Sequence, residues 1–213
     1  MKRILCYGDS NTWGYMPGTG VRYAPDVRWT GILQKELGDE ALVIEEGLNG
    51  RTTVYDHPAT PYRNGLSYLM PCLISQKPLD LVVLMLGTND LGLTDAYGAV
   101  EGARCLCKQI RLAHHLEESS PIFTEGPRIL LMAPPLAHEA INQRDRPERI
   151  RHYPEESRSF ARLYEGLAQE LGLDYLDAAA YTCPSPIDGV HLDAESHRRL
   201  GLAVAEKIRE ILF

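Results

Sequence analysis

Apolar and polar residues are arranged in two different patterns along this chain, and the two patterns alternate. Short continuous apolar runs predict buried strands. Longer segments, in which apolar residues recur every three or four positions, predict helices with one buried face. The runs predict strands at residues 3–7, 42–44, 79–86, 128–133 and 174–177. The helical spacing predicts helices at residues 27–37, 66–76, 96–116, 155–171 and 193–212.

Strand and helix therefore alternate five times, with no internal repeat and no linker between them. Strands that are apolar throughout, joined by helices, are typical of a parallel sheet covered on both faces. We expect one α/β domain over residues 1–213. Its predicted architecture is a three-layer α/β/α sandwich around a five-stranded parallel sheet.

Composition narrows the possible partners. The chain has 213 residues, of which 44% are hydrophobic and 24% charged, as is usual for soluble globular proteins. Its net charge of −7 argues against nucleic-acid binding, which requires a basic face. No apolar run is long enough to cross a bilayer, so we expect no membrane partner.

Two further features predict a cytoplasmic protein. The basic start is followed by a short apolar stretch, residues 4–7, before Gly8 and Asp9 interrupt it, whereas a signal peptide needs a longer apolar region. The five cysteines are odd in number and include no C-x-x-C pair for metal or redox chemistry.

Candidate catalytic residues follow the predicted strands, at the sheet edge where parallel sheets bind ligands. Ser10 comes directly after the first strand, in a Gly-Asp-Ser turn. A serine becomes a nucleophile only when a neighbouring base takes its proton. His191 is the candidate base, and Asp188 is the carboxylate that would orient it. Taken singly, Ser10 also fits a turn or helix cap, and Asp188 fits a turn.

An oxyanion hole requires hydrogen-bond donors beside the nucleophile. Gly50 follows the second strand, where the missing side chain lets a backbone N–H approach the substrate. Asn89 follows the third strand and carries a side-chain amide, and the Ser10 N–H would be a third donor. Alone, Gly50 fits an ordinary turn and Asn89 a helix cap. If the strand order is 2-1-3-4-5, all three residues meet at one edge, and this conjunction favours catalysis.

These segments resemble, in order, the four sequence blocks of the SGNH (GDSL-type) hydrolase family. The matching residues are 8–10, 48–50, 87–90 and 188–191, with Asn11 where leucine is common in the family. The resemblance implies a flavodoxin-like sheet of order 2-1-3-4-5 and a Ser10-His191-Asp188 triad. It also implies oxyanion donors from Ser10, Gly50 and Asn89, and neither a metal nor an organic cofactor.

Residues 26–31, and residues 45–48 followed by 51–53, look like the bacterial arylesterase/acyltransferase branch of that family. Members of the branch act on short acyl esters, some transfer the acyl group to acceptors other than water, and many are oligomers. The resemblance thus implies a homo-oligomeric serine esterase for small-molecule esters. Three alternatives stay open: acyl transfer; carbohydrate deacetylation, lysophospholipase or thioesterase activity; and a non-catalytic binding module on the same scaffold.

The substrate side of the site is less determined. Four aromatic residues follow the nucleophile, and each fits either a pocket wall or core and subunit packing: Trp13, Tyr15, Tyr23 and Trp29. We expect Trp13 and Asn11 to contact the substrate. Residues 136–154 have no clear periodicity and fit a lid, a substrate wall, a subunit contact or a solvated loop.

Overall fold

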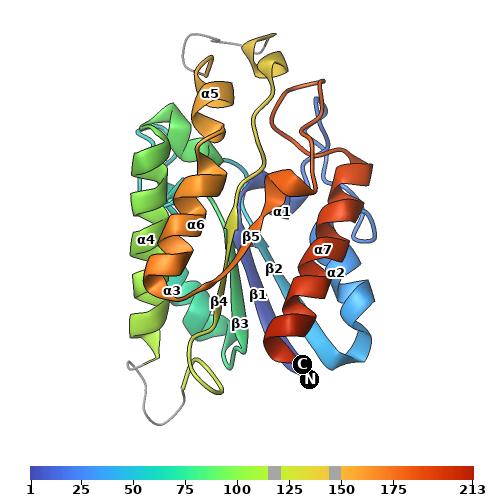
Figure 1. The fold of residues 1–213 in the computed structure, drawn as a ribbon, viewed down its shortest axis with the longest axis vertical. Coiled ribbons are helices and arrows are strands. Elements are labelled where there is room, and N and C mark those ends of the chain that lie inside the picture. The colour runs from blue at the N-terminus through green and yellow to red at the C-terminus, as the bar shows by residue number, and fades with distance from the viewer. Residues whose placement is uncertain (115–120, 144–149) are drawn as a thin grey trace.

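A five-stranded parallel sheet lies at the centre of the protein, between two layers of helices (Figure 1). The computed structural model describes residues 1–114, 121–143 and 150–213. The strands are β1 (Lys2–Gly8), β2 (Ala41–Gly47), β3 (Leu81–Met85), β4 (Ile129–Ala133) and β5 (Asp174–Asp177). Their order is β2-β1-β3-β4-β5 and every neighbouring pair is parallel. The predicted three-layer sandwich and strand order are confirmed.

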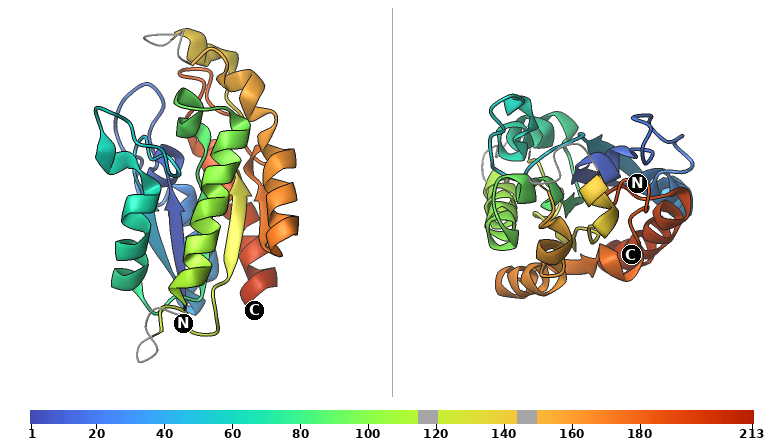
Figure 2. Two further views of the ribbon diagram at one scale, coloured as in Figure 1. Left: turned by 90° about the vertical axis from the view of Figure 1, so that its left-hand side faces the viewer. Right: turned by 90° about the horizontal axis from the view of Figure 1, so that it is seen from above.

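Helices cover both faces of the sheet (Figures 1 and 2). One face carries α2 (Trp29–Leu37) and α7 (Ala194–Leu212), and the other carries α3 (Gly65–Gln76), α4 (Ala96–Ala113) and α6 (Phe160–Leu171). Two short helices, α1 (Ser10–Trp13) and α5 (Tyr153–Ser157), lie beyond the carboxyl ends of the strands. None of the helices in the described ranges has the length and apolarity needed to span a membrane.

The helix predicted over residues 155–171 is wrong in one respect, because two helices occupy this stretch. The first, α5, ends at Ser157, and the second, α6, begins at Phe160. The Ser157 hydroxyl donates to the Pro154 carbonyl (3.1 Å) and accepts from the Ala137 N–H (3.0 Å). The bond from Ala137 ties α5 to the preceding loop, whereas α6 packs on the sheet. The predicted helix over residues 96–116 ends, in the described part, at Ala113.

Alternation along each strand divides the core into two layers. On β1, Ile4 and Cys6 pack into the layer formed with α2 and α7. Leu5 and Tyr7 point to the other face and pack with α3, α4 and α6. All four side chains are at most 1% exposed, so β1 is a rigid support for the turn that follows it.

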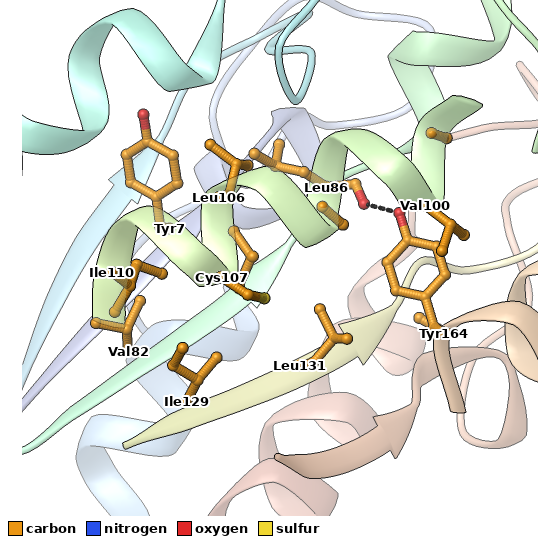
Figure 3. Close-up of a cluster of buried hydrophobic side chains, with 14 of the residues drawn as sticks. Tyr7, Val82, Leu86, Val100, Leu106, Cys107, Ile110, Ile129, Leu131 and Tyr164 are labelled. Atoms are coloured by element: carbon orange, nitrogen blue, oxygen red, sulfur yellow. Dashed lines mark hydrogen bonds between the residues drawn. The ribbon is translucent and has the colours of Figure 1, made fainter. Parts of the chain in front are cut away.

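One buried contact in the second layer shapes the turn after β3 (Figure 3). The Tyr164 hydroxyl of α6 donates to the Leu86 carbonyl at 2.5 Å. The next residue, Gly87, has φ +141°, and a Cβ at this position would lie 2.3 Å from the Tyr164 hydroxyl oxygen. Only glycine fits both constraints. The chain is thereby held in the direction that delivers Asn89 to the sheet edge.

Candidate active site

Ser10 is the first residue of α1, directly after β1 and its turn. Asp9 caps this short helix, because its Oδ1 accepts from the Asn11 N–H at 2.9 Å. Burial raises the pKa of the Asp9 carboxyl to about 6, although the Asn11 hydrogen bond and the positive charges of His191 and Arg51 oppose the shift. The cap fixes the Ser10 side chain at the carboxyl edge of the sheet.

Ser10, His191 and Asp188 form an unbroken chain of hydrogen bonds. Ser10 Oγ lies 3.0 Å from His191 Nε2. His191 Nδ1 lies 2.8 Å from Asp188 Oδ2. Each residue is 6% exposed, so these bonds are shielded from bulk water. The predicted spacing of three residues between acid and histidine thus brings the two side chains into direct contact.

The surroundings of Asp188 fix the state of the histidine. Asp188 Oδ1 accepts the N–H groups of Val190 (3.1 Å) and His191 (3.0 Å), and Oδ2 also accepts the Gly18 N–H (3.1 Å). Burial acts to raise the pKa of Asp188, but the hydrogen bonds and charge of His191 outweigh it and hold the pKa well below its usual range. An ionised carboxylate only accepts, so His191 Nδ1 carries the hydrogen. In the neutral imidazole Nε2 is then the acceptor that faces Ser10.

Tyr15 stacks on the imidazole of His191, with ring centroids 4.1 Å apart and an interplanar angle of 25°. The stack holds the imidazole in the plane that serves both Ser10 and Asp188. An aromatic face also favours a positive charge beside it, so the contact suits an imidazolium that forms during a reaction. Of the four aromatic residues considered from the sequence, Tyr15 is the one that lines the pocket.

Gly50 and Asn89 lie beside Ser10, as predicted. Gly50 has φ +76°, a conformation that favours glycine. Within the described residues, no acceptor takes the N–H of Ser10 or of Gly50. Both donors are therefore free to bind an oxygen atom placed at Ser10.

The amide of Asn89 has one firmly held hydrogen and one that is weakly held. Asn89 Nδ2 donates to the Arg51 carbonyl at 3.0 Å and to Asp9 Oδ2 at 3.4 Å. The second distance lies beyond the usual range of N–H···O bonds. The bond to Arg51 orients the amide, and the other hydrogen is available to a ligand.

A cavity of about 320 Å³ opens above Ser10. Its polar lining consists of Ser10, Tyr15, Asn49, Gly50, Arg63, Asn89 and His191, whereas Ile141, Ile150, Tyr153 and Val190 provide apolar surface. Three of these four come from residues 136–154, so the described part of this segment forms a wall of the pocket. Residues 144–149 lie outside the described residues.

Neither Asn11 nor Trp13, the two residues expected to contact the substrate, is among the residues that line the cavity. The Asn11 side chain is 1% exposed and joins the serine turn to the histidine loop. Its Nδ2 donates to the Val190 carbonyl (3.2 Å) and its Oδ1 accepts the Leu192 N–H (3.1 Å). The Asn11 amide therefore holds the loop on both sides of His191, and a contact of Asn11 with the substrate stays a prediction.

Trp13 lies to the side of the site, with the Arg22 guanidinium 5.3 Å from its ring centroid. The other two aromatic residues have structural places. Trp29 is fully buried in the core, and Tyr23 packs edge-on against His197, with centroids 5.4 Å apart.

The two segments that resembled the arylesterase branch bind each other. Arg28 donates from Nε to Glu45 Oε1 (3.0 Å) and from Nη2 to Glu45 Oε2 (2.6 Å). Thr30 also donates to the Glu45 carboxylate. Burial acts to raise the pKa of Glu45, but the bonds from Arg28 and Thr30 leave it lowered. This ion pair ties the start of α2 to the end of β2 and supports the loop that carries Gly50.

Sequence reasoning missed Arg63, whose side chain lines the pocket next to Gly50. It ends a single 3₁₀ turn, Pro61–Arg63, between β2 and α3, and neither periodicity nor a family block pointed to it. Within the described ranges, no cluster of three or more His, Cys, Asp and Glu side chains is arranged to hold a metal ion.

Comparisons with known proteins place this geometry in a family. Over its full length the chain matches the solved structure of the Mycobacterium smegmatis aryl esterase, with 38% identity, a TM-score of 0.88 and the whole of that chain covered. It matches a carbohydrate acetylesterase from Sinorhizobium meliloti with 35% identity and a TM-score of 0.88, again over the full length of both chains.

A putative arylesterase from Agrobacterium tumefaciens is 40% identical, with a TM-score of 0.87 and full coverage of both chains. No curated protein matches the sequence. The model of the GDSL-like lipase/acylhydrolase family matches residues 6–199. The chain therefore belongs to the GDSL-like (SGNH) lipase/acylhydrolase family and is a carboxylic ester hydrolase.

Proposed function

We propose that this protein is a serine esterase that cleaves small acyl or aryl esters through an acyl-enzyme formed on Ser10. The observation that carries the proposal is the hydrogen-bond chain from Ser10 Oγ through His191 to an ionised Asp188. A triad of this kind activates a hydroxyl group that would otherwise be a poor nucleophile.

In the acylation step, Ser10 Oγ attacks the ester carbonyl carbon while His191 Nε2 takes the hydroxyl proton. Asp188 stabilises the imidazolium that results, and Tyr15 stacks on its face. The carbonyl oxygen becomes an oxyanion, for which Ser10 N–H, Gly50 N–H and Asn89 Nδ2 are the donors. His191 then returns the proton to the alcohol oxygen as the bond from the carbonyl carbon to that oxygen breaks.

In the second step, water attacks the acyl carbon and gives a proton to His191 Nε2. The bond from the acyl carbon to Ser10 Oγ then breaks, His191 returns the proton to Oγ, and the carboxylic acid leaves. An alcohol that replaces water gives a new ester instead. The cavity exposes both apolar and polar side chains above Ser10, so it suits either acceptor.

Pocket size favours small substrates. A volume of about 320 Å³ lies at the lower end of the range of ligand sites. The wall formed by Ile141, Ile150 and Tyr153 suits a short acyl chain or a single aromatic ring. An acetylated carbohydrate is the second candidate, supported by the similarity to a carbohydrate acetylesterase and by the polar side of the pocket.

The central test is Ser10→Ala, assayed with p-nitrophenyl acetate. We expect kcat to fall about 10⁴-fold or more, because the nucleophile is lost and only binding and the oxyanion donors remain. An unchanged circular dichroism spectrum is the control for folding. A mutant that retains turnover within tenfold of the wild type would overturn the proposal.

Hydrolysis and acyl transfer are distinguished by product analysis in the presence of excess primary alcohol. We expect a transesterified product if the alcohol reaches the acyl-enzyme. If the carboxylic acid is the sole product at every alcohol concentration, the protein is a hydrolase alone. Acetylated xylose run beside phenyl acetate tests the carbohydrate candidate by the ratio of their kcat/KM values.

A further inference from the structure

Among the described residues that line the pocket, Arg63 is the single arginine or lysine. None of these lining residues is an aspartate or a glutamate. The lining is otherwise neutral or belongs to the Ser10–His191 pair. A substrate bound above Ser10 therefore meets one strong positive charge, and that charge comes from Arg63.

The Arg63 guanidinium has no polar partner in the described part of the chain. Its Nε is buried without a hydrogen bond, and no described carboxylate lies within ion-pairing distance. The aromatic ring of Tyr62 is 6.0 Å from its Cζ, at the outer limit of a cation–π contact. A buried donor without a partner is costly, and native structures usually satisfy such groups.

Arg28 and Arg51, which are buried, differ from Arg63 in this respect. Arg28 is bound to the Glu45 carboxylate through two nitrogens and to the Tyr23 carbonyl. Arg51 donates from Nη1 to the Gly8 and Glu46 carbonyls and lies over the Tyr7 ring, although its Nε is also buried without a partner. Both of these guanidinium groups are thus held by polar partners, whereas that of Arg63, beside the nucleophile, has none in the described part of the chain.

The position of Arg63 is fixed by its backbone. Its carbonyl accepts the Thr52 N–H at 3.0 Å, and its N–H donates to the Thr60 carbonyl at 3.1 Å. The guanidinium packs flat on Gly50, where a Cβ would lie 2.9 Å from Cζ, Nε and Nη1. The charge is therefore held next to the Gly50 N–H, close to the place of the scissile carbonyl.

A guanidinium presents a planar fork of donors that matches the two oxygens of a carboxylate. A phosphate dianion carries two negative charges against the one positive charge that Arg63 supplies in this pocket, and a neutral ester would leave the fork unsatisfied. We propose that Arg63 binds a carboxylate of the substrate, so the preferred substrates are small esters whose acyl or alcohol part carries a carboxylate. This inference rests on the proposed esterase function.

The test compares matched charged and neutral esters on the full chain. Ethyl hydrogen succinate against ethyl butyrate places the carboxylate on the acyl side. Para-acetoxybenzoate against its methyl ester places it on the alcohol side. Hydrolysis is followed at neutral pH by titration of the released acid for the first pair and by chromatography for the second.

In wild type we expect a higher kcat/KM for the charged ester in one pair, which identifies the side that carries the charge. Arg63→Gln should reduce the charged-to-neutral ratio of kcat/KM in that pair about 10- to 100-fold, the loss expected for a hydrogen bond to a charged group. Arg63→Lys keeps the charge without the planar fork, so its charged-to-neutral ratio should lie between those of wild type and Arg63→Gln. Arg162→Gln on α6, exposed and remote from the pocket, is the matched control and should keep the wild-type ratio.

The proposal is overturned if wild type prefers neither charged ester or if Arg63→Gln keeps the wild-type ratio. It is also overturned if Arg63→Gln lowers kcat/KM equally for the charged and the neutral ester of a pair. Each of these leaves the esterase function intact as long as wild type cleaves the neutral esters and Ser10→Ala does not. Failure of the proposed function appears differently, as turnover that survives in Ser10→Ala.

Discussion

The two sides of the pocket differ in how their polar groups are bonded. On the histidine side, defined by Ser10, Tyr15, Asp188 and His191, each imidazole nitrogen has a partner and Asp188 accepts four hydrogen bonds. On the glycine side, defined by Asn49, Gly50, Arg63 and Asn89, polar groups remain open.

The open groups on the glycine side are the N–H of Gly50, Oδ1 of Asn49 and Nε of Arg63. Polar groups that are hydrogen-bonded to each other before the substrate arrives, as on the histidine side, are preorganised for the proton transfer that cleavage of any ester requires. A group left open is stabilised only when a ligand binds it. The difference indicates that the histidine side carries the proton transfer, whereas the glycine side, together with the Ser10 N–H, binds the oxyanion and determines the choice of substrate.

The largest effect should come from Asp188→Asn. An asparagine amide at this position no longer enforces a hydrogen on Nδ1, so Nε2 loses its role as base, and we expect kcat to fall about 10⁴-fold. Turnover of p-nitrophenyl acetate measures the loss. Asp177→Asn, at the end of β5, is the control. A decrease of less than tenfold for Asp188→Asn would show that the histidine side does not depend on its acid.

Asn89→Ala tests the glycine side. It removes one of three oxyanion donors, and we expect kcat to fall about 100- to 1000-fold, with a smaller change in KM. Steady-state kinetics with a neutral ester separates the two constants. A rise in KM with an unchanged kcat would instead assign Asn89 to ground-state binding.

The stack of Tyr15 on His191 should have a smaller effect. Replacing the ring in Tyr15→Leu removes the aromatic face beside the imidazolium, and we expect kcat/KM to decrease about 3- to 10-fold. Tyr15→Phe keeps the ring and should restore nearly all of the activity. If Phe and Leu variants are equally impaired, the hydroxyl group and not the stack is what matters.

Asp90 should affect stability more than turnover. Its carboxylate is fully buried and accepts the Thr53 N–H at 3.0 Å, and burial raises its pKa to about 7 in spite of the Thr53 hydrogen bonds. The pKa of an aspartate in an unfolded chain is about 4. The folded chain therefore binds this proton more tightly than the unfolded chain, and its contribution to stability is complete below about pH 4 and is lost as the pH rises through 7.

Urea unfolding at a series of pH values measures this dependence. We expect Asp90→Asn to flatten the decline in the free energy of unfolding between about pH 4 and 7, because asparagine does not titrate. Asp9, with a pKa raised to about 6, contributes a decline of the same sign that persists in this variant. An identical pH profile for wild type and Asp90→Asn would show that Asp90 is ionised in the folded protein.

The sequence predicted what depends on local pattern and on strand order. The strands followed from their apolar runs, and Ser10, Gly50, Asn89 and His191 meet because parallel strands end at one edge. Arg63 was not predictable in this way, since its place depends on the path of the segment between β2 and α3, which folds back on the loop after β2 through the Thr52–Asn64 bridge.

The structural bonds of Asn11 could not be predicted, because they go to residues 190 and 192, far away in the sequence. The break between α5 and α6 likewise depends on a tertiary hydrogen bond from Ala137 to Ser157, which helical periodicity cannot predict. The single-domain boundary, the homo-oligomer and the cytoplasmic location stay predictions.

The identity of the nucleophile is tested most directly by a fluorophosphonate probe followed by peptide mapping. Such a probe reacts with a serine only where a base has activated it and donors hold the resulting oxyanion. We predict a single adduct on Ser10, lost in His191→Ala and blocked by prior incubation with substrate. An adduct on another residue, or full esterase activity after Ser10 has been modified, would contradict the account.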